Sequence, residues 1–469
     1  MKNTPKKLLC TLLAAAAMLS FTAVNVYAHE EGEEETTQSQ SDSPELFEGD
    51  VFSNEAFTYN KANGGVYITS CDSNTTSVNI LESVDGYKIL GIYDNAFSGC
   101  SQLRSVSIAD GISYIGKSAF LSCEKLETVK LPSGITTIPE QCFAQCTSLK
   151  DIEIPDTVTS IGSYAFSYCD NLSELKLPSS VTEIGDYAFA FSNMAESFKV
   201  EEGVKTIGYM AFYCTDGIKN ISLSSTVETI GTLAFAGCTG LESFETAENS
   251  QYFKTSGGVL YSKDGTILEC FPMGKNTVEF TIPDTVKFIP SGAFFDNPYV
   301  EKVNMPDSVE AIGEGAFSNC TALRHINLSQ KLTEIGDSVF CDCSSLKSID
   351  IPASVATIGN YAFLECTSLK SITVPDTVTS IGDYALGFTD DDEGKFHKLD
   401  GFEIKANFDT AAKDYAKKNH VSIDYLDGNK DLPYIIAVVC VIAVIVIGIA
   451  VSVVIVIRKK KKSDEFYQK

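Results

Sequence analysis

The feature that most constrains this fold is a 23-residue period that runs through most of the chain. Its marker is the aromatic residue of a recurring IGxxAF block, and successive markers are 23 residues apart except for one step of 59. The markers are Phe97, Phe120, Phe143, Phe166, Phe189, Phe212, Phe235, Phe294, Phe317, Phe340 and Phe363, with Leu386 closing the series. A self-similar period of this length indicates a solenoid.

Each marker follows an isoleucine by five residues, and in most units apolar residues stand six, nine and eleven residues after the marker. One such unit cannot bury its own apolar side, but stacked units bury a continuous core. The LxxIxLP pattern predicts a short strand with inward side chains at period two, so stacked units would form a parallel sheet and a rod about 60 Å long. The glycine after the isoleucine, as in Gly116, Gly162 and Gly359, predicts a tight turn with positive φ.

The pattern LxxIxLPxxVxxIGxxAFxxC resembles the BspA-type leucine-rich repeat family of surface proteins over roughly residues 78–388. The resemblance implies an α/β-type repeat solenoid, with right-handed leucine-rich coils and a parallel β-sheet, displayed outside a bacterial-type cell. Members of the family are often described as adhesins. The resemblance carries over no catalytic motif and no cofactor site.

Composition changes along the chain predict its domain boundaries. Residues 1–28 are typical of a signal peptide, because basic residues precede an apolar run and a small-residue cleavage site. Residues 29–50 are acidic and predicted to be disordered. Five segments follow: an N-terminal cap with a partial repeat (51–96), a first repeat block (97–245), an insertion (246–282), a second repeat block (283–388), and a C-terminal cap with a juxtamembrane linker (389–432).

Residues 433–457 predict a single C-terminal transmembrane helix. They form an almost uninterrupted apolar run that is long enough to cross a bilayer. Five bases begin the tail at 458–469, which favours a cytoplasmic location for the tail. We therefore expect a single-pass protein of the cell membrane with its N-terminal ectodomain outside the cell.

Three segments depart from the regular repeat. The insertion predicts a β-hairpin around Asp264-Gly265, either as a protruding binding element or, as we favour, as an elaborated coil packed on its neighbours. The unit between Phe189 and Phe212 lacks the usual cysteine and proline, which predicts a local bend. Residues 399–426 predict a strand, a helix capped by Thr410, and a second strand that together cover the last coil.

Eight of the fifteen cysteines share the position three residues after the marker. They are Cys100, Cys123, Cys146, Cys169, Cys238, Cys320, Cys343 and Cys366. Zinc sites would need clustered ligands, and the chain has only four histidines. Export would permit disulfides, but side chains in one column run parallel, which disfavours bridging. We favour a column of buried thiols that pack as small hydrophobic groups.

The sequence indicates a binding protein and not an enzyme. It has no phosphate-binding loop, nucleophile elbow or HExxH motif, and we expect no catalytic residue, metal or cofactor. A net charge of −26 argues against nucleic acid as the ligand. We expect an extracellular protein or glycan as partner, including one on a host surface.

The candidate ligand-binding residues fall into two groups. The first projects outward from the predicted strands and changes from coil to coil: Arg104, Lys150, Glu153, Lys176, Lys302, Asn304, Arg324, His325 and Asn327. The second is a tyrosine column two residues before the marker: Tyr164, Tyr187, Tyr361 and Tyr384. Two alternatives stay open: an envelope spacer or scaffold without a specific ligand, and a co-receptor that acts through a membrane partner.

Overall fold

The computed structural model describes residues 43–427 except 55, 174 and 392, together with residues 441, 442 and 445. Among these residues, none belongs to a helix that is both long and apolar enough to cross a membrane. The predicted signal peptide, most of the acidic segment, the basic tail and nearly all of the predicted membrane segment lie outside the described residues.

The repeats stack into a parallel β-solenoid with two strand series. Strands of the first series begin about eight residues after the marker, and they form what we call the long-strand sheet. Its strands are β4 (Ser77–Ile80), β7 (Ser105–Ile108), β9 (Thr128–Lys130), β11 (Asp151–Ile152), β14 (Ser197–Val200), β16 (Asn220–Leu223), β18 (Ser243–Thr246), β21 (Glu279–Thr281), β23 (Lys302–Asn304), β25 (His325–Asn327), β28 (Ser371–Thr373), β32 (Glu403–Ala406) and β33 (Ser422–Tyr425). Neighbouring strands pair one repeat apart, as in Ser105↔Thr128.

The second series consists mostly of two-residue strands that end at the recurring isoleucine, and we call it the short-strand sheet. Its strands are β6 (Tyr87–Ile92), β8 (Tyr114–Ile115), β10 (Thr137–Ile138), β12 (Ser160–Ile161), β13 (Glu183–Ile184), β15 (Thr206–Ile207), β17 (Thr229–Ile230), β22 (Phe288–Ile289), β24 (Ala311–Ile312), β26 (Glu334–Ile335), β27 (Thr357–Ile358) and β29 (Ser380–Ile381). The coils of the described residues contain no helix, so the fold is a β-solenoid with little helix and the α/β class expected from the sequence is too broad.

The marker phenylalanines form the centre of the core. Each ring stacks on the ring of the next coil, with centroid separations of 5.0 Å for Phe97 and Phe120 and 5.4 Å for Phe120 and Phe143. The stack runs unbroken to Phe235, and a second stack runs from Phe271 to Phe363. Offset rings at this spacing add to the free energy gained from burying their area. The apolar core is therefore continuous within each repeat block, but it forms two main clusters and not the single continuous core that the repeat predicted.

A ribbon of turns, from three residues before the marker to two after it, closes the third side of each coil. Residues two before and two after the marker adopt positive φ, as at Ser118 (54°) and Ser122 (59°). Such angles cost an ordinary residue about 1 kcal/mol or more, but they aim backbone N–H groups at the next coil. The N–H of Phe120, for example, donates to Cys142 O at 2.9 Å.

The prediction of positive φ at the glycine after the isoleucine is wrong. Gly116, Gly162 and Gly359 have ordinary φ values. A Cβ on Gly162 would lie 2.6 Å from the backbone nitrogen of Glu140 in the preceding coil. At these three positions glycine is therefore explained by the close approach of adjacent coils, and not by a turn conformation.

The cysteine column is buried and hydrogen-bonded. Each described thiol from Cys123 onward in this column donates to the carbonyl oxygen of the marker phenylalanine one coil earlier, at 3.0 to 3.3 Å. Where the cysteine is replaced, Ser192 and Thr215 make the same bond, to Phe166 O at 2.6 Å and Phe189 O at 2.8 Å, whereas Asn297 donates to Met273 O at 3.1 Å. Within residues 43–427 no disulfide forms. The position therefore selects a small side chain with a donor, which hydrophobic packing alone did not predict.

The insertion supplies a coil whose marker the sequence pattern does not reveal. Phe271 stands 23 residues before Phe294 and stacks on it at 4.8 Å. Before it, β19 (Phe253–Ser256) and β20 (Val259–Ser262) form an antiparallel hairpin that turns at Gly257-Gly258, not at the predicted Asp264-Gly265. The residues on either side of the Asp264-Gly265 turn form only one isolated antiparallel bridge, between Leu260 and Cys270.

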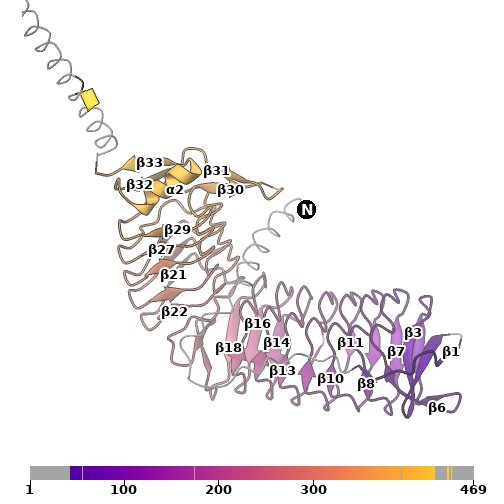
Figure 1. Ribbon diagram of the computed structural model, residues 1–469. Helices are drawn as coiled ribbons and strands as arrows, with labels where there is room; N and C mark the ends of the chain where they lie inside the picture. The colour runs from indigo at the N-terminus through magenta and orange to yellow at the C-terminus, as the bar shows by residue number, and fades with distance from the viewer. Residues whose placement is uncertain are drawn as a thin grey trace, which may run out of the picture.

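Strand β20 lies between the two core clusters. Leu260 belongs to the first cluster, whereas its neighbours Val259 and Tyr261 belong to the second. The insertion therefore packs on both blocks, in agreement with the favoured interpretation. Figure 1 shows that the two blocks form arms that meet at a corner here, so the expected single rod is bent.

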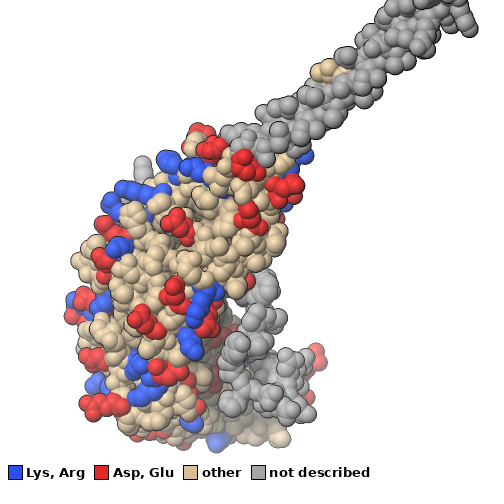
Figure 2. Space-filling view, turned by 90° about the vertical axis from the view of Figure 1, so that its left-hand side faces the viewer, with Lys and Arg blue, Asp and Glu red and all other residues tan. Residues whose placement is uncertain are grey.

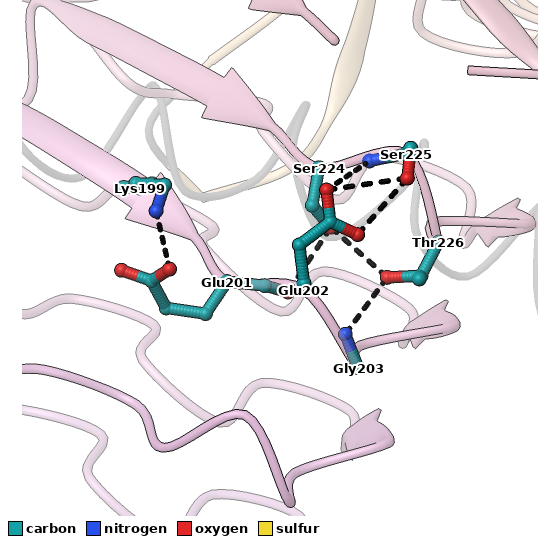
Figure 3. Close-up of polar contacts among 7 residues, drawn as sticks. All are labelled: Lys199, Glu201, Glu202, Gly203, Ser224, Ser225 and Thr226. Atoms are coloured by element: carbon teal, nitrogen blue, oxygen red, sulfur yellow. Dashed lines mark hydrogen bonds and ion pairs between the residues drawn. The ribbon is translucent and has the colours of Figure 1, made fainter. Parts of the chain in front are cut away.

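The unit between Phe189 and Phe212 does not produce the predicted bend. Strands β14 and β16 pair in the regular parallel register, with Ser197 opposite Asn220. Polar contacts tie this unit to the next coil: Thr226 Oγ1 accepts from Gly203 N at 3.0 Å, and Ser225 Oγ donates to Glu202 Oε2 at 3.0 Å (Figure 3). These contacts hold the register although the usual side chains are missing.

Both ends of the solenoid carry caps. At the N-terminus, β1 (Val51–Ser53), β2 (Phe57–Ala62) and β3 (Gly65–Cys71) form antiparallel pairs, β3 then pairs with β6 in parallel, and β5 (Ser83–Val84) pairs with β6. At the C-terminus, the hairpin of β30 (Phe388–Asp390) and β31 (Phe396–Lys398) precedes the predicted strand, helix and strand, namely β32, α2 (Ala411–Asn419) and β33. Thr410 stands at the helix N-cap, but its hydroxyl donates to Asn407 O at 2.9 Å and makes no cap bond.

The C-terminal cap completes the backbone hydrogen bonding of the last coil. From Phe97 to Phe212 and from Phe271 to Phe363 the marker N–H donates to the following coil, but after Leu386 no further coil follows in the described residues. Its N–H instead donates to the Tyr415 hydroxyl of α2 at 2.9 Å. The side chain of Tyr415 is buried, so the helix replaces a missing coil with one hydroxyl group.

Candidate binding surface

The outward face of the long-strand sheet carries two shallow, open hollows. One has a volume of about 300 Å³ and lies over β23 and β25, where Lys302, Asn304, His325, Asn327, Ser348 and Asp350 line it. The other has a volume of about 350 Å³ and lies over β4, β7 and β9. The sheet positions these side chains because alternate residues of each strand point out of the core. The structure thus brings together four of the predicted residues around the first hollow.

Three of the predicted cations are engaged in ion pairs between adjacent coils. Their partners stand one repeat away, which places them side by side on the parallel sheet: Arg104 Nη1 with Glu127 Oε1 at 2.9 Å, Lys302 Nζ with Glu279 Oε1 at 2.7 Å, and Arg324 Nε with Glu301 Oε2 at 3.2 Å. Hydrogen bonds from Lys302 and Asn304 lower the pKa of Glu279. Exposed pairs of this kind contribute about 0–1 kcal/mol each.

The two predicted asparagines also make contacts across coils. The side-chain amide of Asn304 donates to Glu279 Oε1 at 2.8 Å and to Thr281 Oγ1 at 3.1 Å. Asn327 donates to Met305 O at 2.8 Å and accepts from Met305 N at 3.3 Å. The amide of Asn327 therefore serves the neighbouring backbone, which leaves it little capacity for a ligand.

Four predicted residues keep their polar groups available. Lys150, Glu153, Lys176 and His325 are exposed, and their side chains have no hydrogen bond or ion pair with another described residue. Lys150, Glu153 and Lys176 lie in adjacent coils of the first block, whereas His325 lies in the second block. These side chains are the best placed of the predicted set to contact a partner.

Charges of both signs are interspersed over the surface. Figure 2 shows lysine and arginine side chains alternating with acidic ones on the face turned to the viewer, without a large area of one sign. Among the described residues, no group of three or more His, Cys, Asp or Glu is arranged to hold a metal ion. Such a surface suits recognition of a partner whose own charges are mixed.

The tyrosine column lies on the turn ribbon, away from the long-strand sheet. The rings of Tyr164 and Tyr187 stack with centroids 4.6 Å apart and an interplanar angle of 5°. Both residues have positive φ values, 58° and 54°, which direct their side chains outward. Tyr187 then meets the edge of Tyr209 at 5.5 Å. Burial raises the pKa of both Tyr164 and Tyr187. Because each ring covers a face of its neighbour, the column presents mainly ring edges and hydroxyl groups.

The other two predicted tyrosines are covered by the C-terminal cap. Phe396 of β31 stacks on Tyr384 with centroids 4.0 Å apart and on Tyr361 at 5.7 Å. Burial also raises the pKa of Tyr361. These two rings therefore attach the hairpin of β30 and β31 to the solenoid, and they are poorly placed for a ligand.

The structure also reveals surface residues outside the set of predicted ligand-binding residues. The second hollow is lined by hydroxyl and amide groups together with one cation: Ser77, Asn79, Ser105, Ser107, Thr128 and Lys130. Two of these hydroxyl groups, on Ser77 and Ser105, lie 2.6 Å apart. They occupy the same outward strand positions as the predicted residues, so the repeat register could have identified them. Most of these side chains are small and uncharged, so a search for charged residues that vary from coil to coil did not select them.

Comparisons with known proteins agree with this architecture. The family model for the BspA type leucine rich repeat region (6 copies) matches residues 69–194, 159–257 and 268–390. A solved structure of a leucine rich cell surface protein from Faecalibacterium prausnitzii is 29% identical with a TM-score of 0.60, and the match covers 82% of this chain and 99% of that one. A leucine-rich repeat protein from Bacteroides ovatus is 27% identical with a TM-score of 0.54, over 77% of this chain and 89% of that one.

The pneumococcal vaccine antigen PcpA shares the fold at 21% identity, with a TM-score of 0.59 over 80% of this chain and 98% of that one. No curated protein matches the chain. The matched repeats cover well over half of the residues, and their strands, stacked phenylalanines and turns follow the family's period. The chain therefore belongs to the BspA-type leucine-rich repeat family.

Proposed function

We propose that this protein is a non-catalytic, adhesin-like binding module on the outside of the cell, and that its long-strand sheet binds an extracellular protein. The observation that carries the proposal is the pair of open hollows on one sheet face, lined by side chains that change from coil to coil. A similar solved structure is described as a cell surface protein, and the predicted signal peptide and membrane segment support the same location.

The geometry of the face favours a macromolecular ligand. Both hollows are shallow and open, whereas small-molecule sites usually enclose most of their ligand. The candidate residues extend over many coils and both blocks, so one extended partner could contact several of them. Lys150, Lys176 and His325 supply available polar groups, two of them cationic, on a chain whose net charge is −26. Cationic side chains at fixed positions on an otherwise acidic protein would orient a partner that carries charges of both signs.

A second candidate function, a structural spacer of the cell envelope, is favoured by a different observation. Arg104, Lys302 and Arg324 are all used in ion pairs between coils. Side chains used in this way stabilise the stack and need no ligand. The two functions predict different results in a binding experiment.

The experiment is a binding screen of the full chain in mild detergent against extracellular matrix proteins, other cells and cell-wall glycans. The test variant is Lys150→Glu with Lys176→Glu, which reverses two available charges, one directly before β11 and one at the matching face of the next coil. The matched control is Lys287→Glu with Lys331→Glu, which changes the same charges at exposed sites outside the long-strand sheet.

We expect a protein ligand whose affinity falls at least tenfold in the test variant and stays unchanged in the control. Equal loss in both variants would assign the effect to net charge alone. Binding of glycans only would overturn the protein ligand. Failure to bind any member of the panel, together with a weakened cell envelope after gene deletion, would favour the spacer.

A further inference from the structure

The turn ribbon of the first repeat block carries two columns of outward side chains. They stand two residues before and two residues after the marker, where φ values between 54° and 62° direct the side chains away from the core. From the coil of Phe120 to the coil of Phe189, the first column consists of Ser118, Gln141, Tyr164 and Tyr187, and the second consists of Ser122, Gln145, Tyr168 and Phe191. Both columns therefore change from polar side chains to aromatic rings between the same two coils.

The first ring of each aromatic run keeps one face that no other ring covers. Tyr168 stacks on Phe191 with centroids 4.6 Å apart and an interplanar angle of 11°, in the same way as Tyr164 stacks on Tyr187. One coil earlier the same positions hold glutamines, so no ring of the described residues stacks on the other face of either tyrosine. Tyr164 and Tyr168 are 36% and 43% exposed, which makes both rings accessible to a ligand.

The glutamines supply hydrogen-bond donors next to these rings. Ser118 Oγ donates to Gln141 Oε1 at 3.1 Å, and Ser122 Oγ donates to Gln145 Oε1 at 2.7 Å. These bonds hold each amide beside the serine of the preceding coil. The NH2 groups of both amides have no hydrogen-bond partner among the residues that the structure describes. Each amide can therefore donate to a ligand that lies on the tyrosine of the following coil.

The turns of these four coils have little charge available for an ionic ligand. Lys117 is their one cation, and its Nζ pairs with Glu140 Oε2 at 3.0 Å. The one further charged side chain is Asp186, whose Oδ1 accepts from Tyr209 N at 2.8 Å. The charge that is left over is negative, and it would repel an anion. The surface therefore suits an uncharged ligand.

The dimensions of this surface suit an oligosaccharide better than a folded protein. The four coils span about 15 Å at the usual spacing of parallel strands, and the two columns, four residues apart, lie at most about 14 Å from each other. The resulting area of about 200 Å² is far below the roughly 800 Å² that each partner buries in a standard protein interface. Sugar rings carry C–H groups on their faces and hydroxyl groups around their rims, which match aromatic faces flanked by amide donors.

We propose that the turn ribbon between the coils of Phe120 and Phe189 is a binding site for an uncharged oligosaccharide. One sugar ring stacks on Tyr164 and another on Tyr168, while the amides of Gln141 and Gln145 donate to sugar hydroxyl groups. This inference goes beyond the protein ligand proposed above, because the site lies on another side of the coil and takes another class of ligand.

The test is isothermal titration calorimetry of the full chain in a detergent that has no sugar head group. The probes are uncharged hexasaccharides derived from cellulose, starch, mannan and laminarin, with a hyaluronan hexasaccharide as the anionic comparison. We expect at least one uncharged probe to bind and the hyaluronan probe not to bind. Tyr164→Ala with Tyr168→Ala should weaken that binding at least tenfold, and Gln141→Leu with Gln145→Leu at least fivefold.

The matched control is Tyr252→Ala with Tyr299→Ala, which removes two rings that are similarly exposed, at 45% and 39%, but lie outside the turn ribbon. It should leave the affinity unchanged. If the tyrosine variant of the ribbon does not fold, as judged by its melting temperature, the glutamine variant still decides.

Four results would overturn the proposal. They are failure of every uncharged probe to bind, tighter binding of the hyaluronan probe, binding that survives either variant of the ribbon, and an equal loss of affinity in the control. The protein ligand of the long-strand sheet is measured in a separate assay with other variants, so the two proposals fail independently.

Discussion

The hydrogen bond from the column thiols leads to a prediction that separates two roles of cysteine. Cys146 is fully buried, and its Sγ donates to Phe120 O at 3.2 Å. If the position requires only a small apolar group, alanine should be tolerated about as well as serine. If it requires a donor, serine should be tolerated better, because its hydroxyl can reach the same carbonyl.

The contacts of Cys146 give the expected change in the free energy of unfolding for each variant. Cys146→Ala removes one buried heavy atom, worth about 0.8 kcal/mol of transfer free energy, and one net hydrogen bond of about 0.5–1.5 kcal/mol. We therefore expect the free energy of unfolding to fall by about 1.5–2 kcal/mol. Cys146→Ser keeps a donor, as Ser192 does at 2.6 Å from Phe166 O, and should cost about 1 kcal/mol or less. Cys146→Val loses the donor and adds bulk, with an expected cost of about 2–3 kcal/mol.

The measurement is urea unfolding of the full chain, with the transition midpoint compared among the three variants. Amide exchange of the coils around Phe120 checks that the effect is local, because coils contact mainly their neighbours. Ser192→Ala and Ser192→Cys provide the reciprocal control, and cysteine should restore part of what alanine loses. Equal midpoints for Cys146→Ser and Cys146→Ala would refute the role of the donor.

Three further predictions concern the cap, the corner and the core. Tyr415→Phe removes the hydroxyl that accepts from Leu386 N at 2.9 Å, so we expect faster amide exchange at Leu386 and a loss of about 1–3 kcal/mol in thermal unfolding. Burial, and secondarily the charge of Asp264, raises the pKa of Glu269 to about 7 from an ordinary 4.5. Stability from this group is therefore complete below pH 4.5 and falls as the pH rises to about 7, by at most about 3 kcal/mol. Glu269→Gln should flatten the urea midpoint over that pH range, and an unchanged pH dependence would contradict the assignment. Phe340→Ala removes a fully buried ring from the stack and should cost about 3–5 kcal/mol by urea unfolding, whereas Tyr168→Ala, at an exposed ring, should cost far less.

The repeat period predicted most of the fold because it records contacts between neighbouring coils. Each recurring Phe is buried, as is each recurring Ile except the partly buried Ile230 and Ile381, and strands pair one period apart, since a solenoid uses the same local environment many times. The strand, helix and strand of the C-terminal cap were also predicted correctly, because their patterns are local.

Features that depend on the approach of separate segments could not be predicted. The pattern did not reveal Phe271 as a marker, because the IGxxAF block is absent around it and only stacking on Phe294 identifies it. The role of Gly162 depends on the distance to another coil. The strands on which the candidate residues stand were predictable, but their ion pairs, such as Arg324 with Glu301, emerge only when coils are placed side by side.

The capping hydroxyl of Tyr415 has a consequence for self-association. Throughout the turn ribbon, N–H groups are directed toward the C-terminal end of the stack and carbonyl groups toward the N-terminal end. Two uncovered stacks would therefore match head to tail, and repeated joining of that kind does not close and produces filaments. Helix α2 ends the sequence of donors at Leu386 with a side chain, which blocks head-to-tail joining at this end of the stack.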